Sequence, residues 1–327
     1  MPLYPLRFKP RYVQKMWGGR KIESVLRKPL PPGPIGESWE LYDFPPGVVD
    51  NSPGWMSAEV ADGPLKGKTL HDLVGQFRNE LMGDIPLVGD GQFPLLIKFL
   101  DAREDLSVQV HPDEAYARAN PGAHLKNEAW YIVQADPGSR LLKGLRPGVT
   151  REAFAKSIAD GSVESTIHSI NVKPGDCFYL PSGTVHALGA GILAAEVQTP
   201  SDTTYRVFDF NRVDPSTGKP RTLHIDQAMK CIDFSAKQPK PHPGPELVKC
   251  DHFTIAKVTM NKGAQRIIPG GEPIVLMLIH GHGRVETAGH TTQFTRGDTI
   301  LLPASVSETS VFADAEILWL EVKLQSR

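Results

Sequence analysis

The sequence has few cysteines, no long apolar run and no excess of charge of either sign. Its only cysteines are Cys177, Cys231 and Cys250, and an odd, sparse set without close pairs does not indicate a disulfide framework. We therefore expect free thiols in a reducing compartment, and the cytoplasm as the location. No stretch approaches 18 apolar residues, so no membrane span is predicted. The first residues also lack the charged region and apolar run of a signal peptide.

The charge balance argues against a nucleic-acid partner. The 36 lysines and arginines offset 37 aspartates and glutamates, which leaves a net charge of −1, whereas nucleic-acid binders carry a basic stripe. The Gly-x-x-x-x-Gly-Lys loop that cradles nucleotide phosphates is also missing. A pocket for a single phosphate is still compatible with this composition, because it requires only two or three basic side chains.

Glycine and proline are abundant and separate short apolar runs. The 30 glycines and 29 prolines are turn signals, and short runs between turns predict many short strands. The strands are expected at residues 93–99, 129–133, 177–180, 192–198, 273–280, 299–302 and 317–322. Residues 69–82 and 150–160 instead show helical spacing of apolar side chains. Thr69 and Thr150 are their expected N-caps, and Gly161 is the expected stop of the second helix.

An internal repeat points to the fold. Residues 174–186 and 296–308 both contain Gly-Asp, a short apolar strand and then Leu-Pro at the same offset. Such turn–strand–turn units build cupin barrels. The first copy ends in His186 and the second in Glu308. We predict a mostly β, double cupin fold of two jelly-roll β-barrels with inserted α-helices, in which only the first barrel holds a metal.

The domain boundary is predicted at a proline-rich segment with almost no apolar residues. Such a composition is typical of an extended linker. We expect a catalytic, metal-binding cupin domain with helical insertions at residues 1–235, a linker at 236–246, and a degenerate cupin domain at 247–327.

Four residues form a candidate metal site. Gln109 and His111 are two apart on an expected strand and therefore point to the same face. Glu128 begins an apolar strand, where a carboxylate needs a partner or a metal, and His186 follows the Leu-Pro turn. Imidazole and carboxylate groups are normal zinc ligands, and this set leaves a position for water or substrate. Ser107 shares the face of Gln109 and is a candidate substrate contact.

In these stretches the sequence resembles the type I phosphomannose isomerase family, particularly its short bacterial form. The Gln-Val-His-Pro and Ser-Asp-x-x-x-Arg motifs, in this order, are the most specific signals. The matching stretches are residues 5–10, 17–19, 36–40, 106–112, 126–131, 181–187 and 198–206.

The resemblance implies both an activity and a set of site residues. It implies one zinc ion per chain, held by Gln109, His111, Glu128 and His186. It also implies an active-site arginine at Arg206 and an active-site lysine at Lys126, and a small sugar-phosphate substrate, since the family interconverts mannose 6-phosphate and fructose 6-phosphate.

One position departs from the family pattern. Longer members carry a histidine immediately before the lysine, where this chain has Leu125. The nearest histidine, His124, is one step further away and would face the other side of a strand. We therefore do not assign His124 as the base.

Aldose–ketose isomerisation moves a proton between C1 and C2 through an enediol, so it requires a base and stabilisation of an oxyanion. Arg206 is expected to stabilise the oxyanion or to grip the phosphate, and Lys126 to assist ring opening or hold an oxygen. Asp202 and a water on the metal are the candidate bases. Trp17 and Trp39 either wall the sugar pocket or belong to the core, and we take Trp17 as a substrate contact.

Two other functions remain open from the sequence. Another metal-dependent cupin enzyme, such as an iron dioxygenase or an isomerase of free sugars, would use two histidines and a carboxylate. A non-catalytic sugar-binding cupin is the second alternative, although it would have no use for the lysine and arginine beside the metal. The oligomeric state is not predicted.

Overall fold

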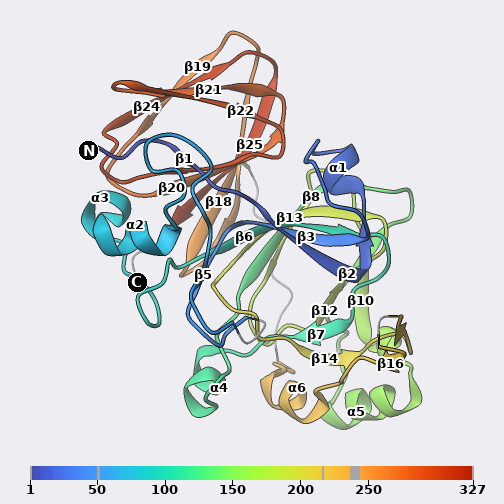
Figure 1. Cartoon of the computed structure of the whole chain (residues 1–327). Coiled ribbons are helices and arrows are strands. Elements are labelled where there is room, and N and C mark those ends of the chain that lie inside the picture. Colours follow the sequence, from blue (N-terminus) through green and yellow to red (C-terminus); the bar gives the residue numbers. More distant parts are fainter. Residues whose placement is uncertain (1, 50–51, 216, 236–243, 326–327) are drawn as a thin grey trace.

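The computed structural model describes residues 2–49, 52–215, 217–235 and 244–325 and has a mostly β cupin fold built from two units (Figure 1). In the first unit a six-stranded sheet faces a five-stranded one. The larger sheet has the order β11 (Cys177–Leu180), β8 (Glu128–Ala135), β13 (Ile192–Gln198), β6 (Leu96–Ala102), β2 (Arg11–Gly19) and β3 (Ile35–Leu41). The smaller sheet has the order β10 (Ile167–Asn171), β9 (Arg140–Leu145), β12 (His186–Leu188), β7 (Val108–Val110) and β14 (Tyr205–Phe208).

The second unit repeats this plan with a six-stranded and a four-stranded sheet. The larger sheet has the order β1 (Leu6–Arg7), β23 (Thr299–Leu302), β20 (Ile274–His280), β25 (Ile317–Leu324), β18 (Phe253–Met260) and β17 (Glu246–Lys249). The smaller sheet has the order β19 (Gln265–Pro269), β24 (Glu308–Ala313), β21 (His282–Thr287) and β22 (His290–Thr295). Two further pairs are β4 (Asp43–Phe44) with β5 (Met56–Ser57), and β15 (Val213–Asp214) with β16 (Lys219–Pro220).

The apolar core lies in layers because strand side chains alternate between faces. On β8, Trp130 points into the interior of the first unit, whereas Tyr131 points toward the second unit. Tyr131 shares one continuous buried cluster with Phe253 and Met277 of the second unit. The two six-stranded sheets therefore pack back to back, and this shared layer joins the units.

The segment expected as one helix at residues 69–82 forms two. Helix α2 (Leu70–Gln76) begins at a capping box in which Thr69 and Asp72 bind each other's backbone N–H, as predicted for the cap. The chain breaks at Phe77, whose φ of −130° is not helical, and α3 (Arg78–Met82) follows. The prediction of a single helix is therefore wrong. The Glu80 and Leu81 carbonyls accept hydrogen bonds from a loop of the second unit, so tertiary contacts set this break.

The second expected helix is confirmed. Helix α5 (Arg151–Asp160) begins after Thr150, whose hydroxyl accepts a hydrogen bond from the Ala153 N–H at 3.2 Å. It ends at Gly161, which is left-handed with φ of +78°. The remaining helices are α1 (Lys21–Ser24), α4 (Glu114–Ala119) and α6 (Ile225–Cys231). Helices α4, α5 and α6 lie beside the five-stranded sheet (Figure 1), and α5 buries Phe154 against it.

The sequence repeat corresponds to a structural repeat. The Asp176 carboxylate accepts a hydrogen bond from the Lys173 N–H at 2.9 Å, and the Asp298 carboxylate accepts one from Thr295 at 2.8 Å. The glycine before each aspartate has a φ of +94° in the first copy and +92° in the second. Each turn leads into a four-residue strand, β11 or β23. The two units are therefore built from the same turn chemistry.

Most expected strands are confirmed, with shifted ends in some. Strands β11, β13 and β23 have the predicted bounds, whereas β8, β20 and β25 differ by one to two residues at one or both ends. Strand β6 begins at Leu96, three residues later than predicted. The reason is that the Phe93 N–H donates to the buried Asp43 carboxylate at 3.0 Å instead of to a neighbouring strand.

The N-terminal strand belongs to the second unit. Leu6 pairs with Leu301 and Arg7 with Ile300 across the β1–β23 pair, and Figure 1 shows this blue segment running beside the red strands. The domain limits 1–235 and 247–327 remain a prediction, and most of the predicted linker, residues 236–243, lies outside the described residues.

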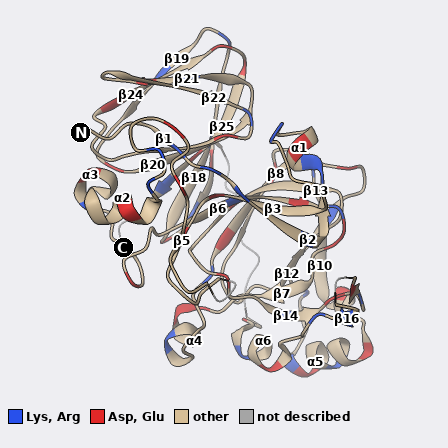
Figure 2. Ribbon diagram, viewed as in Figure 1, with Lys and Arg blue, Asp and Glu red and all other residues tan. Residues whose placement is uncertain are grey.

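Charged residues are scattered along both units with the two signs interspersed (Figure 2). None of the helices described has the length and apolar character needed to cross a membrane.

Candidate metal centre and active site

Three neighbouring strands of the five-stranded sheet place the central residues in one row. His186 on β12 pairs with Gln109 on β7, and Gln109 pairs with Arg206 on β14. Residues paired across strands point to the same face, so the three side chains project into the interior of the first unit. Val108 and Val110 point the other way and are fully buried under the helices.

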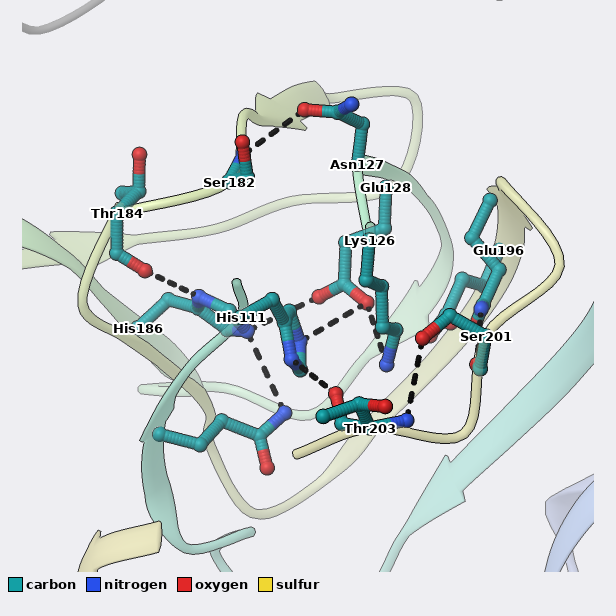
Figure 3. A network of polar contacts seen from close by, with 12 residues as sticks. His111, Lys126, Asn127, Glu128, Ser182, Thr184, His186, Glu196, Ser201 and Thr203 are labelled. Atoms are coloured by element: carbon teal, nitrogen blue, oxygen red, sulfur yellow. Dashed lines mark hydrogen bonds and ion pairs between the residues drawn. The ribbon is translucent and has the colours of Figure 1, made fainter. Parts of the chain in front are cut away.

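A buried group of two histidines and a carboxylate lies at the end of this row (Figure 3). His186 Nε2 is 3.0 Å from Glu128 Oε1, and His111 Nε2 is 3.4 Å from Glu128 Oε2. All ligand atoms of the group lie within 4.8 Å of one another, and no side chain in it is more than 1% exposed. The arrangement is compact enough for one ion.

Backbone carbonyls fix the orientation of both imidazole rings. His111 Nδ1 lies 3.0 Å from the Thr203 carbonyl, and His186 Nδ1 lies 2.8 Å from the Thr184 carbonyl. A carbonyl can only accept a hydrogen bond, so each Nδ1 carries the proton and each Nε2 keeps its lone pair. Outer hydrogen bonds of this kind orient metal-ligating histidines.

The protonation states also suit a cation. Burial, together with the charge of Lys126, lowers the pKa of His111 to about 3, so this imidazole is neutral at physiological pH. Burial opposes ionisation of Glu128, but Lys126 and the two histidines hold the pKa of that carboxyl well below its usual range. Lys126 Nζ lies 3.0 Å from Glu128 Oε2.

The ligand atoms of the group have few hydrogen bonds. Among the described residues, His111 Nε2 and both Glu128 oxygens are buried without a hydrogen bond of good geometry, although Lys126 Nζ forms an ion pair with Glu128 Oε2 at 3.0 Å. Buried polar atoms are rarely left unpaired in native proteins. Two imidazole nitrogens and a carboxylate that converge in this way fit a divalent metal ion.

Gln109 stands beside this group. Its amide Nε2 is 3.3 Å from His186 Nε2, and its Oε1 is 3.5 Å from the Ser107 hydroxyl. A ligating amide uses its oxygen, so metal binding by Gln109 requires the amide to turn and exchange its two ends. The structure brings Gln109 to the metal group, but with its nitrogen toward His186.

A pocket of about 260 Å³ opens onto the metal group from the interior of the unit. All five predicted catalytic and substrate-binding residues line it, together with two of the predicted ligands. These residues are Trp17, Ser107, Gln109, Lys126, Glu128, Asp202 and Arg206. A larger hollow of about 920 Å³ lies near the join of the units, but the residues that line it include none of the four predicted ligands. The predicted site residues therefore gather at the smaller pocket.

The predicted substrate contacts differ in their settings. Trp17 and Ser107 are buried pocket walls, whereas Trp39 lies in the core and donates its Nε1–H to Glu37 at 2.6 Å. Asp202 is exposed at the pocket wall, and the surrounding protein still desolvates its carboxyl enough to raise its pKa. His124 binds the loop at Thr203 and Ser201 through its backbone.

Sequence reasoning missed a buried charged network in the same pocket. Lys98 on β6 lies 3.2 Å from Glu196 and 3.5 Å from Glu37, and all three line the pocket. Glu196 also accepts a hydrogen bond from Trp130 Nε1 at 2.9 Å. Lys98 and Glu196 interrupt apolar strands in the way that Glu128 does. The rule that identified Glu128 therefore applies to them as well.

Within the described part of the chain, Arg206 does not pair with Asp209, which follows it by three residues. Asp209 instead pairs with Arg212 at 2.6 Å and with Arg221. Arg206 faces the pocket, and its Nη1 donates to the Thr222 carbonyl at 2.7 Å.

Comparisons of this sequence with family models and with known proteins all point to the same family. Residues 6–137 match the model of the type I phosphomannose isomerase catalytic domain, and residues 245–320 match that of the mannose-6-phosphate isomerase cupin domain. Mannose-6-phosphate isomerase ManA of Bacillus subtilis is 35% identical over 97% of this chain and 99% of its own length. The mannose-6-phosphate isomerase of Streptococcus mutans is 34% identical over 96% and 97% of the two chains.

A solved structure agrees with these sequence matches. The crystal structure of mannose 6-phosphate isomerase from Bacillus subtilis superposes with a TM-score of 0.86 at 30% identity, and covers 97% of this chain and 99% of that one. The likeness therefore extends over both units.

Proposed function

This chain belongs to the type I phosphomannose isomerase family and is an isomerase of mannose 6-phosphate, and from that premise we propose that it works with one zinc ion per chain through an enediol intermediate. The observation that carries the proposal is the buried group of His111, Glu128 and His186, which opens onto the pocket lined by Lys126 and Arg206. Its partner is then a small sugar phosphate, and its location the cytoplasm, where its three free cysteines are stable as thiols.

Zinc fits the ligand atoms that the chain offers. Two imidazoles and one carboxylate are a common catalytic zinc set, and Gln109 would complete it after its amide turns. When bound, the ion supplies Lewis-acid polarisation of the sugar oxygens. Thr184 and Thr203 hold the two imidazoles in the tautomer that this site needs.

The residues around the ion divide the remaining work. Asp202 is the proposed base for the proton that moves between C1 and C2, because its raised pKa brings it closer to the pH at which a carboxylate is an efficient base. Arg206 on β14 is the cross-strand neighbour of Gln109 on β7. From there its guanidinium stabilises the oxyanion. Lys126 is buried beside Glu128 and holds a sugar oxygen.

A second metal-dependent cupin chemistry shares part of this site. Two histidines and one carboxylate are also the ligand set of iron oxygenases. The charged pocket residues Lys98, Lys126, Glu196 and Arg206 favour an isomerase of a polar, charged sugar over an oxygenase of an apolar substrate.

Chelation followed by metal analysis tests the proposal. The purified chain is assayed with mannose 6-phosphate in a coupled assay, stripped with a chelator, checked by elemental analysis, and reloaded with zinc or iron. We expect activity to vanish with the metal and to return with zinc. Full activity in protein confirmed to be metal-free would refute the metal mechanism, and return of activity with iron alone would refute the assignment of zinc.

A further inference from the structure

A second arginine lines the pocket beside Arg206. Arg221 comes from the chain between β16 and α6, and both guanidinium groups face the same cavity. The segment after Arg221 runs along β14, because the His224 N–H donates to the Arg206 carbonyl at 2.8 Å and Arg206 Nη1 donates to the Thr222 carbonyl at 2.7 Å. The backbone therefore holds the two arginines next to each other.

A buried carboxylate sets the orientation of Arg221. Asp209 is 6% exposed and accepts from Arg221 Nε at 2.8 Å and from Arg221 Nη2. Arg212 binds the same carboxylate at 2.6 Å from the other side. The Nε–Nη2 edge of the Arg221 guanidinium is thus held by a bidentate arginine–carboxylate pair.

Some donors of the two arginines lie outside these contacts. Within the described part of the chain, Arg206 Nε is buried without a hydrogen-bond partner. Arg221 binds Asp209 through Nε and Nη2, which leaves its Nη1 out of that pair. Unsatisfied buried donors are costly, and a ligand that accepts hydrogen bonds would satisfy them.

The charge of this corner is unbalanced. Arg212 and Arg221 both bind the single Asp209 carboxylate, and Arg206 lines the same pocket as Arg221. Glu104 approaches Arg212 only to 3.9 Å with a side chain that is 45% exposed. Burial and the neighbouring Arg221 both lower the pKa of Arg206. A phosphate monoester carries roughly −1.5 to −2 charges at neutral pH and would offset this surplus.

We propose that Arg221 is a substrate-binding residue that holds the phosphate of the sugar, while Asp209 and Arg212 position it. This inference rests on the proposed function. The carbonyl end of the sugar then lies at the metal group. The phosphate end lies at Arg221, beyond the strand that carries Arg206. Arg221 thereby selects phosphorylated sugars over free ones.

The test compares Arg221→Gln and Arg221→Lys with Arg140→Gln, using the full-length protein. Arg140 is a matched control because it also pairs with a carboxylate in the first unit, Glu164 at 2.6 Å, but lies on the surface away from the pocket. Asp209 keeps Arg212 as its partner in every Arg221 variant, so folding is expected to survive, and zinc content and thermal unfolding verify this. The readouts are KM and kcat for mannose 6-phosphate, and the dissociation constant of inorganic phosphate measured by calorimetry.

We expect Arg221→Gln to raise both KM and the phosphate dissociation constant about 10- to 100-fold, as befits loss of a charge-assisted contact. Arg221→Lys should recover part of this loss because it keeps the charge without the fork, and Arg140→Gln should change neither constant. Unchanged KM and phosphate affinity in Arg221→Gln would overturn the proposal, as would a fall in kcat alone. If the wild-type chain binds phosphate but does not isomerise mannose 6-phosphate, the proposed function fails while the phosphate site stands.

Discussion

His111 Nδ1 lies 3.0 Å from the carbonyl oxygen of Thr203. Thr203 belongs to the short loop that carries Asp202 and leads into Arg206 on β14. The loop that carries Asp202 and leads into Arg206, the proposed catalytic residues, is therefore also the loop that orients the imidazole of a proposed metal ligand.

Replacement of His111 by alanine is expected to remove the metal. One of the converging ligand atoms is lost, and the remaining ligands form a weaker site. Elemental analysis of the purified variant measures zinc per chain. His168→Ala, on the edge strand β10 of the same sheet and outside the metal group, is the control and should retain wild-type zinc. A His111→Ala protein that still holds one zinc per chain would show that the ligand set is wrong.

Replacement of Arg206 by alanine is expected to lower turnover by roughly 10²–10³ while zinc stays bound. Arginine remains protonated and is not a metal ligand, so elemental analysis should give the wild-type zinc content. Because Arg206 also faces the proposed phosphate corner, KM should rise as well. Arg206→Lys should recover part of the turnover if charge is what matters. Near-normal kcat and KM in the alanine variant would place this residue outside the active site.

The second unit is expected to bind no metal. His280 and His282 are two residues apart but lie exposed at the β20–β21 turn, and Glu308 occupies the repeat position of His186. The double variant His280→Ala/His282→Ala should therefore leave zinc stoichiometry and activity unchanged. A drop in bound zinc in this variant, or a metal peak beside these histidines in a crystal, would contradict the prediction.

The N-cap of α5 is expected to stabilise the first unit measurably. Thr150→Ala removes the hydroxyl that accepts from the Ala153 N–H and should cost about 0.5–2 kcal/mol. Thermal unfolding should show a lower Tm. Thr150→Ser keeps the oxygen and is the matched control, with a Tm close to wild type. Equal Tm values for the alanine and serine variants would mean that this cap contributes nothing.

The sequence was a good guide where a residue conflicts with its surroundings. Glu128 was identified because a carboxylate at the start of an apolar strand needs a partner, and it lies at the centre of the metal group. Lys98 and Glu196 are charged residues within apolar strands as well, so the same rule could have predicted that they need buried partners. Arg221 gave no such signal, because it lies in irregular chain and is placed at the pocket by its bond to Asp209 and by the contacts of Thr222 and His224 with Arg206.

Long-range packing accounts for the structural differences from the sequence predictions. The break at Phe77 accompanies contacts of Glu80 and Leu81 with the second unit, and no local pattern encodes those contacts. The late start of β6 follows from a hydrogen bond between Phe93 and Asp43, which are far apart in sequence. Turns, in contrast, are formed by residues close together in sequence. The repeat at Asp176 and Asp298 could be predicted from the sequence because each aspartate binds a backbone N–H three residues before it.

The pairing of Leu6 with Leu301 has a consequence for how the protein is made. During translation the first strand leaves the ribosome early, but its partner β23 is among the last segments to be synthesised. Until then Leu6, which is fully buried in the finished protein, has no native neighbour on that edge. Contacts between such distant segments close slowly, and an unpaired strand edge invites association with other chains. The first strand can therefore complete its native pairing only after β23 has left the ribosome.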